Sequence, residues 1–216
     1  MHYNELVDKI NHFEEEYELI ELVYSGAIER LKGVQRDIGT IDDVKHIQRI
    51  IKPFLIGWGM MNRVVGRTGL KWKMLGEKLR NLEKEFGLLR GENFLTVKFD
   101  DKEISDSIKT IYGELDAIPY IGSPTTLSKI LHLLNPKIFV MWDNAIEEHY
   151  HRINHRVDCT AEGYLEFLKE TQKAVLEALN EHKKATGKTL DTIEKELESK
   201  YKNKTITKLI DEYNWV

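Results

Sequence analysis

The sequence predicts an all-α fold whose helices run through nearly the whole chain. Apolar residues recur every three or four positions over most of its length, which is the spacing of one face of a helix. Only 4 prolines and 14 glycines occur among 216 residues, so few positions interrupt a helix. Hydrophobic residues make up 41% of the chain, enough for a substantial core. We therefore expect residues 1–216 to form a single compact all-helical domain.

Apolar spacing also places the individual elements. The first helix is expected over residues 6–24, and a second starts near 40–44 and passes through Pro53. Residues 71–89 predict a third, long helix. Further helices are expected over 103–115, 125–134, 144–151, 160–185, 189–201 and 205–213. Residues 94–99 alternate between apolar and polar side chains, which is typical of a short strand.

The charge of the chain argues against a general affinity for polyanions. The net charge is −4, so a nucleic-acid contact must be a local patch. Residues 1–31 carry eight acidic and two basic side chains, whereas residues 62–90 carry eight basic and three acidic ones. The second stretch is a candidate phosphate-contacting surface, with Arg63 and Arg67 as contacts. A solvated helix face with internal ion pairs is the alternative interpretation.

The numbers and positions of cysteine and histidine residues limit which disulfides, clusters and metal sites the chain can form. The single cysteine, Cys159, excludes an intramolecular disulfide and a cluster held by four thiolates. A reducing, cytoplasmic setting is expected on that ground. His151 and His155 have the spacing of zinc ligands, but they lack the glutamate of a zinc hydrolase motif, so we expect no metal and no cofactor. No stretch approaches the roughly 18 apolar residues of a membrane helix, so no membrane partner is expected.

One segment, residues 115–143, has the features of a binding and catalytic site. It predicts a helix end, a turn Pro119-Tyr-Ile-Gly122, a new helix from about Thr125, and an apolar run that ends at Asp143. Proline fixes one turn dihedral, and glycine is free to adopt a positive φ. Unpaired backbone N–H groups at the start of the new helix suit a phosphate oxygen. The expected phosphate-binding residues are Ile121, Gly122, Ser123, Thr125 and Thr126.

This segment resembles the core of the helix-hairpin-helix DNA glycosylase superfamily. The family pattern reads Leu-x-x-apolar-Pro-Gly-apolar-Gly, then Thr-Ala, then an apolar stretch that ends in a catalytic aspartate. Asp143 follows Gly122 by 21 residues, which agrees with the family spacing. The other matching positions are Leu115, Ile118, Pro119, Ile121 and Thr125 or Thr126.

The resemblance implies a two-lobed helical fold with the hairpin and the catalytic residue inside residues 115–155. It implies binding to double-stranded DNA and hydrolysis of the N-glycosidic bond of a damaged or mispaired base. Asp143 would be the catalytic carboxylate, because a negative charge stabilises the cation that develops on the sugar. Trp142 and Trp58 are candidate walls of a pocket for the extrahelical base.

Three positions depart from the family pattern. Tyr120 replaces the first hairpin glycine, Pro124 replaces the lysine that forms an imine in bifunctional members, and the iron–sulfur cysteines are absent. Lys129 lies farther along the helix, so an active enzyme would be monofunctional, without strand nicking. A non-enzymatic DNA-binding or structural protein and a helical partner-binding scaffold stay open. For Asp143 alone, a plain helix N-cap is the alternative role.

Overall fold

The structure is a computed structural model that describes residues 1–31, 44–57, 71–119, 121, 123–202 and 204–216, without the side chains of 19, 20 and 44–47. These residues form eleven α-helices and no strand, which confirms the all-α prediction. The helices are α1 (Tyr3–Glu16), α2 (Glu18–Leu31), α3 (Val44–Gly57), α5 (Trp72–Asn81), α6 (Glu83–Leu89), α7 (Lys102–Asp116), α8 (Pro124–Leu134), α9 (Asn144–Ile153), α10 (Ala161–Thr186), α11 (Leu190–Lys200) and α12 (Ile206–Trp215). None of them is long and apolar enough to cross a membrane.

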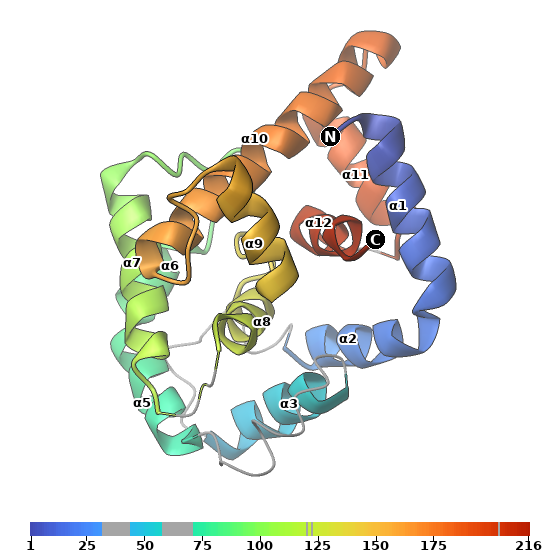
Figure 1. Ribbon diagram of the computed structural model, residues 1–216. Helices are drawn as coiled ribbons and strands as arrows, with labels where there is room; N and C mark the ends of the chain where they lie inside the picture. The colour runs from blue at the N-terminus through green and yellow to red at the C-terminus, as the bar shows by residue number, and fades with distance from the viewer. Residues whose placement is uncertain (32–43, 58–70, 120, 122, 203) are drawn as a thin grey trace.

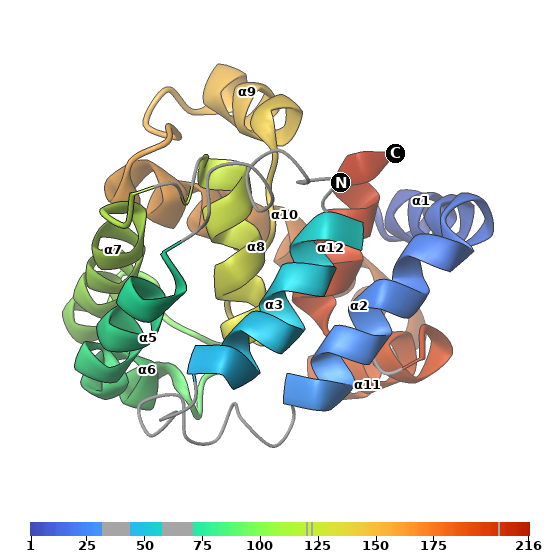
Figure 2. The same ribbon diagram turned by 90° about the horizontal axis from the view of Figure 1, so that it is seen from below.

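Helix α8 is the centre of the fold. Helices α5, α6 and α7 lie on one side of it and α1 and α2 on the other (Figures 1 and 2). It contacts α2, α3 and α7, and every residue from Thr126 to Leu134 is buried. A helix that is buried on all faces needs apolar side chains all round, and the sequence TLSKILHLL supplies mostly those.

The first two helices divide a stretch that the sequence predicts to be one helix. Tyr17 ends α1 with φ −120° and ψ 24°, and its N–H donates to the carbonyl of Phe13. Helix α1 then packs against α12, whereas α2 packs against α3. The apolar spacing continues across the break, so periodicity alone does not reveal it.

Two further sequence predictions are wrong in detail. The helix expected over residues 71–89 is interrupted at the buried Leu82, with φ −98° and ψ 12°, which separates α5 from α6. Residues 94–99 form turns rather than a strand. Asn93 causes this, because its side chain accepts from the Leu95 N–H and its carbonyl accepts from the N–H of Val97.

Candidate functional site

The connection between α7 and α8 is the predicted phosphate site. Within it, the Ile121 N–H donates to the carbonyl of Ile118, and the Ile121 side chain is buried. Ser123 caps α8, and its Oγ accepts from the Thr126 N–H at 3.3 Å. The expectation that the Ile121 and Thr126 N–H groups are unpaired is therefore wrong, because the turn and the cap satisfy them. Gly122 lies outside the described residues, and the half-buried Ser123 and Thr125 remain as polar groups at this connection.

A buried serine joins this connection to the catalytic candidate. Ser128 Oγ donates to the carbonyl of Trp142 at 3.1 Å and accepts from the Trp142 N–H at 3.1 Å. The same hydroxyl also lies 3.1 Å from the carbonyl of Thr125. These contacts, which we call the Ser128 clasp, attach the chain that precedes Asp143 to the first turns of α8. The carboxylate is therefore placed beside the start of α8.

Asp143 is half-buried and caps α9. Its Oδ1 accepts from the N–H groups of Ala145 and Ile146, both at 2.9 Å. Its Oδ2 accepts no hydrogen bond from a described residue. The cap role considered from the sequence is therefore present, and it occupies one of the two carboxylate oxygens.

Lys129 also belongs to this neighbourhood, which its distance from the turn along the sequence does not predict. It is 4% exposed. Burial lowers the pKa of its amino group, and the carboxylates of Asp211 and Asp143 act in the opposite direction. The lysine is thus within electrostatic reach of Asp143 from inside the core.

The tryptophan candidates do not form an open pocket wall in the described residues. Trp142 is 1% exposed, and its ring packs against Tyr164 and Phe167 with centroid distances of 5.1 and 4.9 Å. The prediction for Trp142 is therefore wrong, because this ring is part of the core. Trp58 lies outside the described residues.

The basic surface is described only in part. Arg63 and Arg67 lie outside the described residues. Within the rest of the stretch, Lys73 and Lys78 pair with Glu77 and Glu114. Three exposed cations there form no ion pair with a described residue: Arg80, Lys84 and Arg90.

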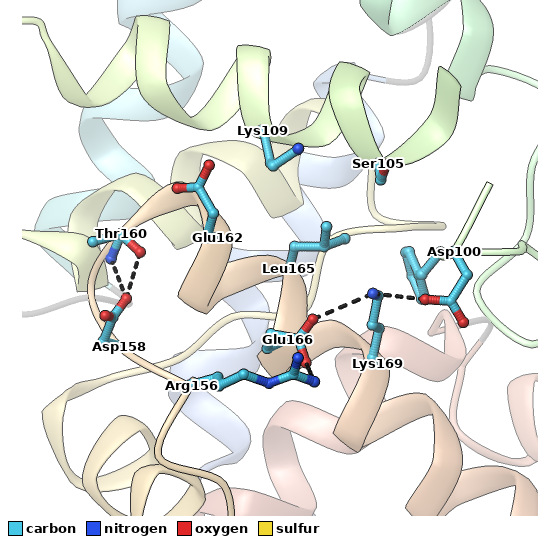
Figure 3. A pocket seen from close by; sticks show the side chains of 11 residues that line it. Asp100, Ser105, Lys109, Arg156, Asp158, Thr160, Glu162, Leu165, Glu166 and Lys169 are labelled. Carbon is cyan, nitrogen blue, oxygen red and sulfur yellow. Dashed lines mark hydrogen bonds and ion pairs between the residues drawn. The ribbon is translucent and has the colours of Figure 1, made fainter. Parts of the chain in front are cut away.

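A separate pocket of about 530 Å³ lies between α7 and α10 (Figure 3). Its charged groups neutralise one another, since Lys169 pairs with Asp100 at 2.7 Å and with Glu166 at 3.2 Å. Arg156 pairs with Glu166 at 2.6 Å. Asp143 does not line this pocket. Because its cations are already paired, we assign it no ligand.

A buried group of charged residues on α12 was not predicted from the sequence. The spacing of residues 205–213 predicts a helix and does not indicate that its charged side chains are buried. In the structure, Lys208, Asp211 and Glu212 are buried. Their spacing within α12 is the same as that of an exposed ion pair, and the contacts with Glu14 of α1 and Glu21 of α2 that complete the buried group come from distant parts of the chain.

The fold and the site together define an all-α protein in which a helix-capping aspartate is fixed beside a helix–turn–helix connection. Comparison with protein-family models, curated proteins and solved structures finds no match. The evidence for function is therefore the geometry of the chain itself.

Proposed function

We propose that this protein binds double-stranded DNA and hydrolyses the N-glycosidic bond of a damaged or mispaired base. The observation that carries the proposal is the Ser128 clasp, which holds Asp143 beside the start of α8. A hairpin that binds the DNA backbone and a carboxylate that acts on the sugar must lie close together, and the clasp meets this requirement.

The hydrogen bonds of Asp143 suit a role in stabilising charge. Two backbone N–H groups fix Oδ1, so the carboxylate is oriented before the substrate arrives. A preorganised charge of this kind lowers the barrier because it does not reorganise during the reaction. Oδ2 then faces the developing cation or orients the attacking water.

The arrangement of helices supports a two-lobed protein. Helices α5, α6 and α7 lie on one side of α8 and α1 and α2 on the other (Figures 1 and 2), and α3 contacts α2, α5 and α8. Phosphate contacts would come from the side chains of Ser123 and Thr125 rather than from the N–H groups of Ile121 and Thr126.

Base release from duplex oligonucleotides tests the proposal. We would use a panel of end-labelled duplexes, each with one uracil, alkylated purine, oxidised purine or mismatch, and would cleave the resulting abasic sites with alkali. Asn caps a helix about as well as Asp, so Asp143→Asn removes the charge and keeps the cap. We expect it to lose about 100-fold or more in rate.

Asp101→Asn is the matched control. Asp101 caps α7 in the same way, through the N–H groups of Glu103 and Ile104. The Asp101→Asn variant should therefore release the base at the wild-type rate. Equal rates in all three proteins would contradict the catalytic role of Asp143. Duplex binding without base release would favour the non-enzymatic alternative, and absence of binding would favour the scaffold.

A further inference from the structure

Helix α12 carries charged side chains through the core. Six residues form what we call the α12 charge cluster: Glu14, Glu21, Lys204, Lys208, Asp211 and Glu212. Lys208 and Glu212 are 0% exposed and Asp211 is 1% exposed. The Lys208 amino group also lies 4.8 and 5.1 Å from the ring centroids of Phe13 and Tyr24. Charges in such surroundings are tolerated only when they are paired.

Most of the cluster is closely paired. Lys208 Nζ lies 2.7 Å from Glu212 Oε1 and 2.9 Å from Glu21 Oε1. Lys204 Nζ lies 2.5 Å from the same Glu212 oxygen and 2.6 Å from Glu21 Oε2, and it also contacts Glu14. Asp211 is the exception, because its ion pair with Lys208 is 3.5 Å long.

Asp211 is the least well paired of the buried acids. Glu21 and Glu212 each lie within 2.9 Å of both Lys204 and Lys208, and Glu14 also pairs with the exposed Lys202 at 3.9 Å. Asp211 has only the 3.5 Å contact with Lys208 among the described residues, although the charge of Lys129 also acts on it. A carboxyl in that position is more stable as the neutral acid.

We propose that α12 is a proton-linked latch, in which Asp211 is protonated while α12 is docked and in which ionisation of Asp211 favours release of the helix. The shift in the pKa of the Asp211 carboxyl agrees with this geometry. Burial raises the pKa of Asp211 to about 7, and Lys208 and Lys129 offset only part of that effect, while Glu212 and Glu21 add to it.

Glu212 is the other buried acid of α12, and burial raises its pKa as well, while its contacts with Lys208 and Lys204 offset part of that effect. Groups on the neighbouring helices also face α12. On α8, burial lowers the pKa of His132 to about 3, so it is neutral across the relevant range, and its Nδ1 donates to the carbonyl of Phe139. On α2, burial raises the pKa of Tyr24. On α1, Glu5 accepts from the Tyr213 hydroxyl at 2.9 Å, and Lys9 lies over the ring of Tyr213. On α11, burial raises the pKa of Glu198. A variant of Glu198 is therefore needed as a control in the test of Asp211.

The sign of the effect follows from the two states. The docked helix binds the Asp211 proton more tightly than the released helix, where the carboxyl has its ordinary pKa of 3.8. Docking is therefore stronger at low pH, weakens as the pH rises toward 7, and is constant above it. Each unit of pH in this window changes the docking equilibrium about tenfold. Between pH 5 and pH 8 the expected change is about 100-fold.

Amide hydrogen exchange of residues 206–215 tests the latch on the full chain. With rates corrected for intrinsic exchange, protection in the wild type should fall about 100-fold between pH 5 and pH 8. In Asp211→Asn it should stay high and independent of pH. Glu198→Gln and Asp191→Asn, both on α11, should keep the wild-type slope. The same slope in wild type and Asp211→Asn would overturn the proposal.

A second measurement covers the case in which Asp211→Asn does not fold. The carboxyl ¹³C shift of Asp211 in the wild-type protein should titrate with a midpoint near 7. A midpoint near 4 would overturn the proposal. Neither readout depends on the proposed DNA chemistry, so the latch can fail or stand separately from it.

Discussion

Ser128 is the residue on which the geometry of the candidate site depends. Its hydroxyl pairs both backbone polar groups of Trp142 inside the core. In Ser128→Ala those groups lose their partner, and an unpaired buried polar group costs about 1–3 kcal/mol. We expect the free energy of unfolding, measured with urea, to fall by about that amount.

Ser107→Ala provides the comparison for this prediction. Ser107 is also a buried helical serine, on α7, but it does not bind Trp142. Its change in stability should be clearly smaller. Base release should fall in Ser128→Ala and not in Ser107→Ala, because only the clasp positions Asp143. Equal effects of the two changes on stability and rate would contradict this role of Ser128.

Lys129 provides a second prediction at the scale of single residues. An imine requires the amine to reach the sugar, and the Lys129 side chain is buried within the core. Borohydride should therefore not trap the protein on abasic duplex DNA, and denaturing gels would show the absence of a covalent adduct. An adduct that disappears in Lys129→Gln would identify Lys129 as a nucleophile and contradict monofunctional chemistry.

At the scale of elements, the stability of α12 depends on the pairing inside its charge cluster. Lys208→Met removes the ammonium that faces Glu21, Asp211 and Glu212. Breaking a buried ion pair from one side costs about 3–5 kcal/mol, because the partner charges remain. The exposed pair of Lys195 with Asp191 is the control, and Lys195→Met should change stability far less, because both charges stay in water. Similar urea midpoints for both variants would contradict the structural importance of the cluster.

Most elements could be predicted from periodicity, because their apolar residues face the core at helical spacing. The breaks at Tyr17 and Leu82 could not, since the apolar pattern continues through both. The prediction of a strand at 94–99 is wrong because the hydrogen bonds that Asn93 accepts from Leu95 and Val97 fold this segment into turns. The alternation of side chains does not reveal these bonds. At the site, the N-cap geometry of Asp143 follows from local sequence. The burial of Trp142 and the placement of Lys129 depend on contacts between distant helices.

At the scale of the whole molecule, a net charge of −4 makes any affinity for DNA depend on a local basic surface. We expect Arg63→Ala and Arg67→Ala each to reduce the slope of log K against log salt by about one, uniformly across DNA sequences. Fluorescence anisotropy with a labelled duplex at several salt concentrations measures this slope. Lys173→Ala, at an exposed position of α10, should leave the slope unchanged. A slope unaffected by both arginine changes would remove residues 62–90 from the interface.

If Asp143 stabilises a positive charge on a sugar in duplex DNA, as we propose, one comparison of affinities tests this role without knowledge of the target base. A duplex with a cationic pyrrolidine in place of one deoxyribose imitates the transition state, and a duplex with neutral tetrahydrofuran at that position is its reference. Transition-state analogues bind about 100-fold or more tightly than ground-state ligands. The wild type and Asp101→Asn should therefore prefer the pyrrolidine duplex about 100-fold, and Asp143→Asn should bind the two duplexes about equally. No preference in the wild type, or the same preference in Asp143→Asn, would contradict the role of Asp143 in stabilising charge.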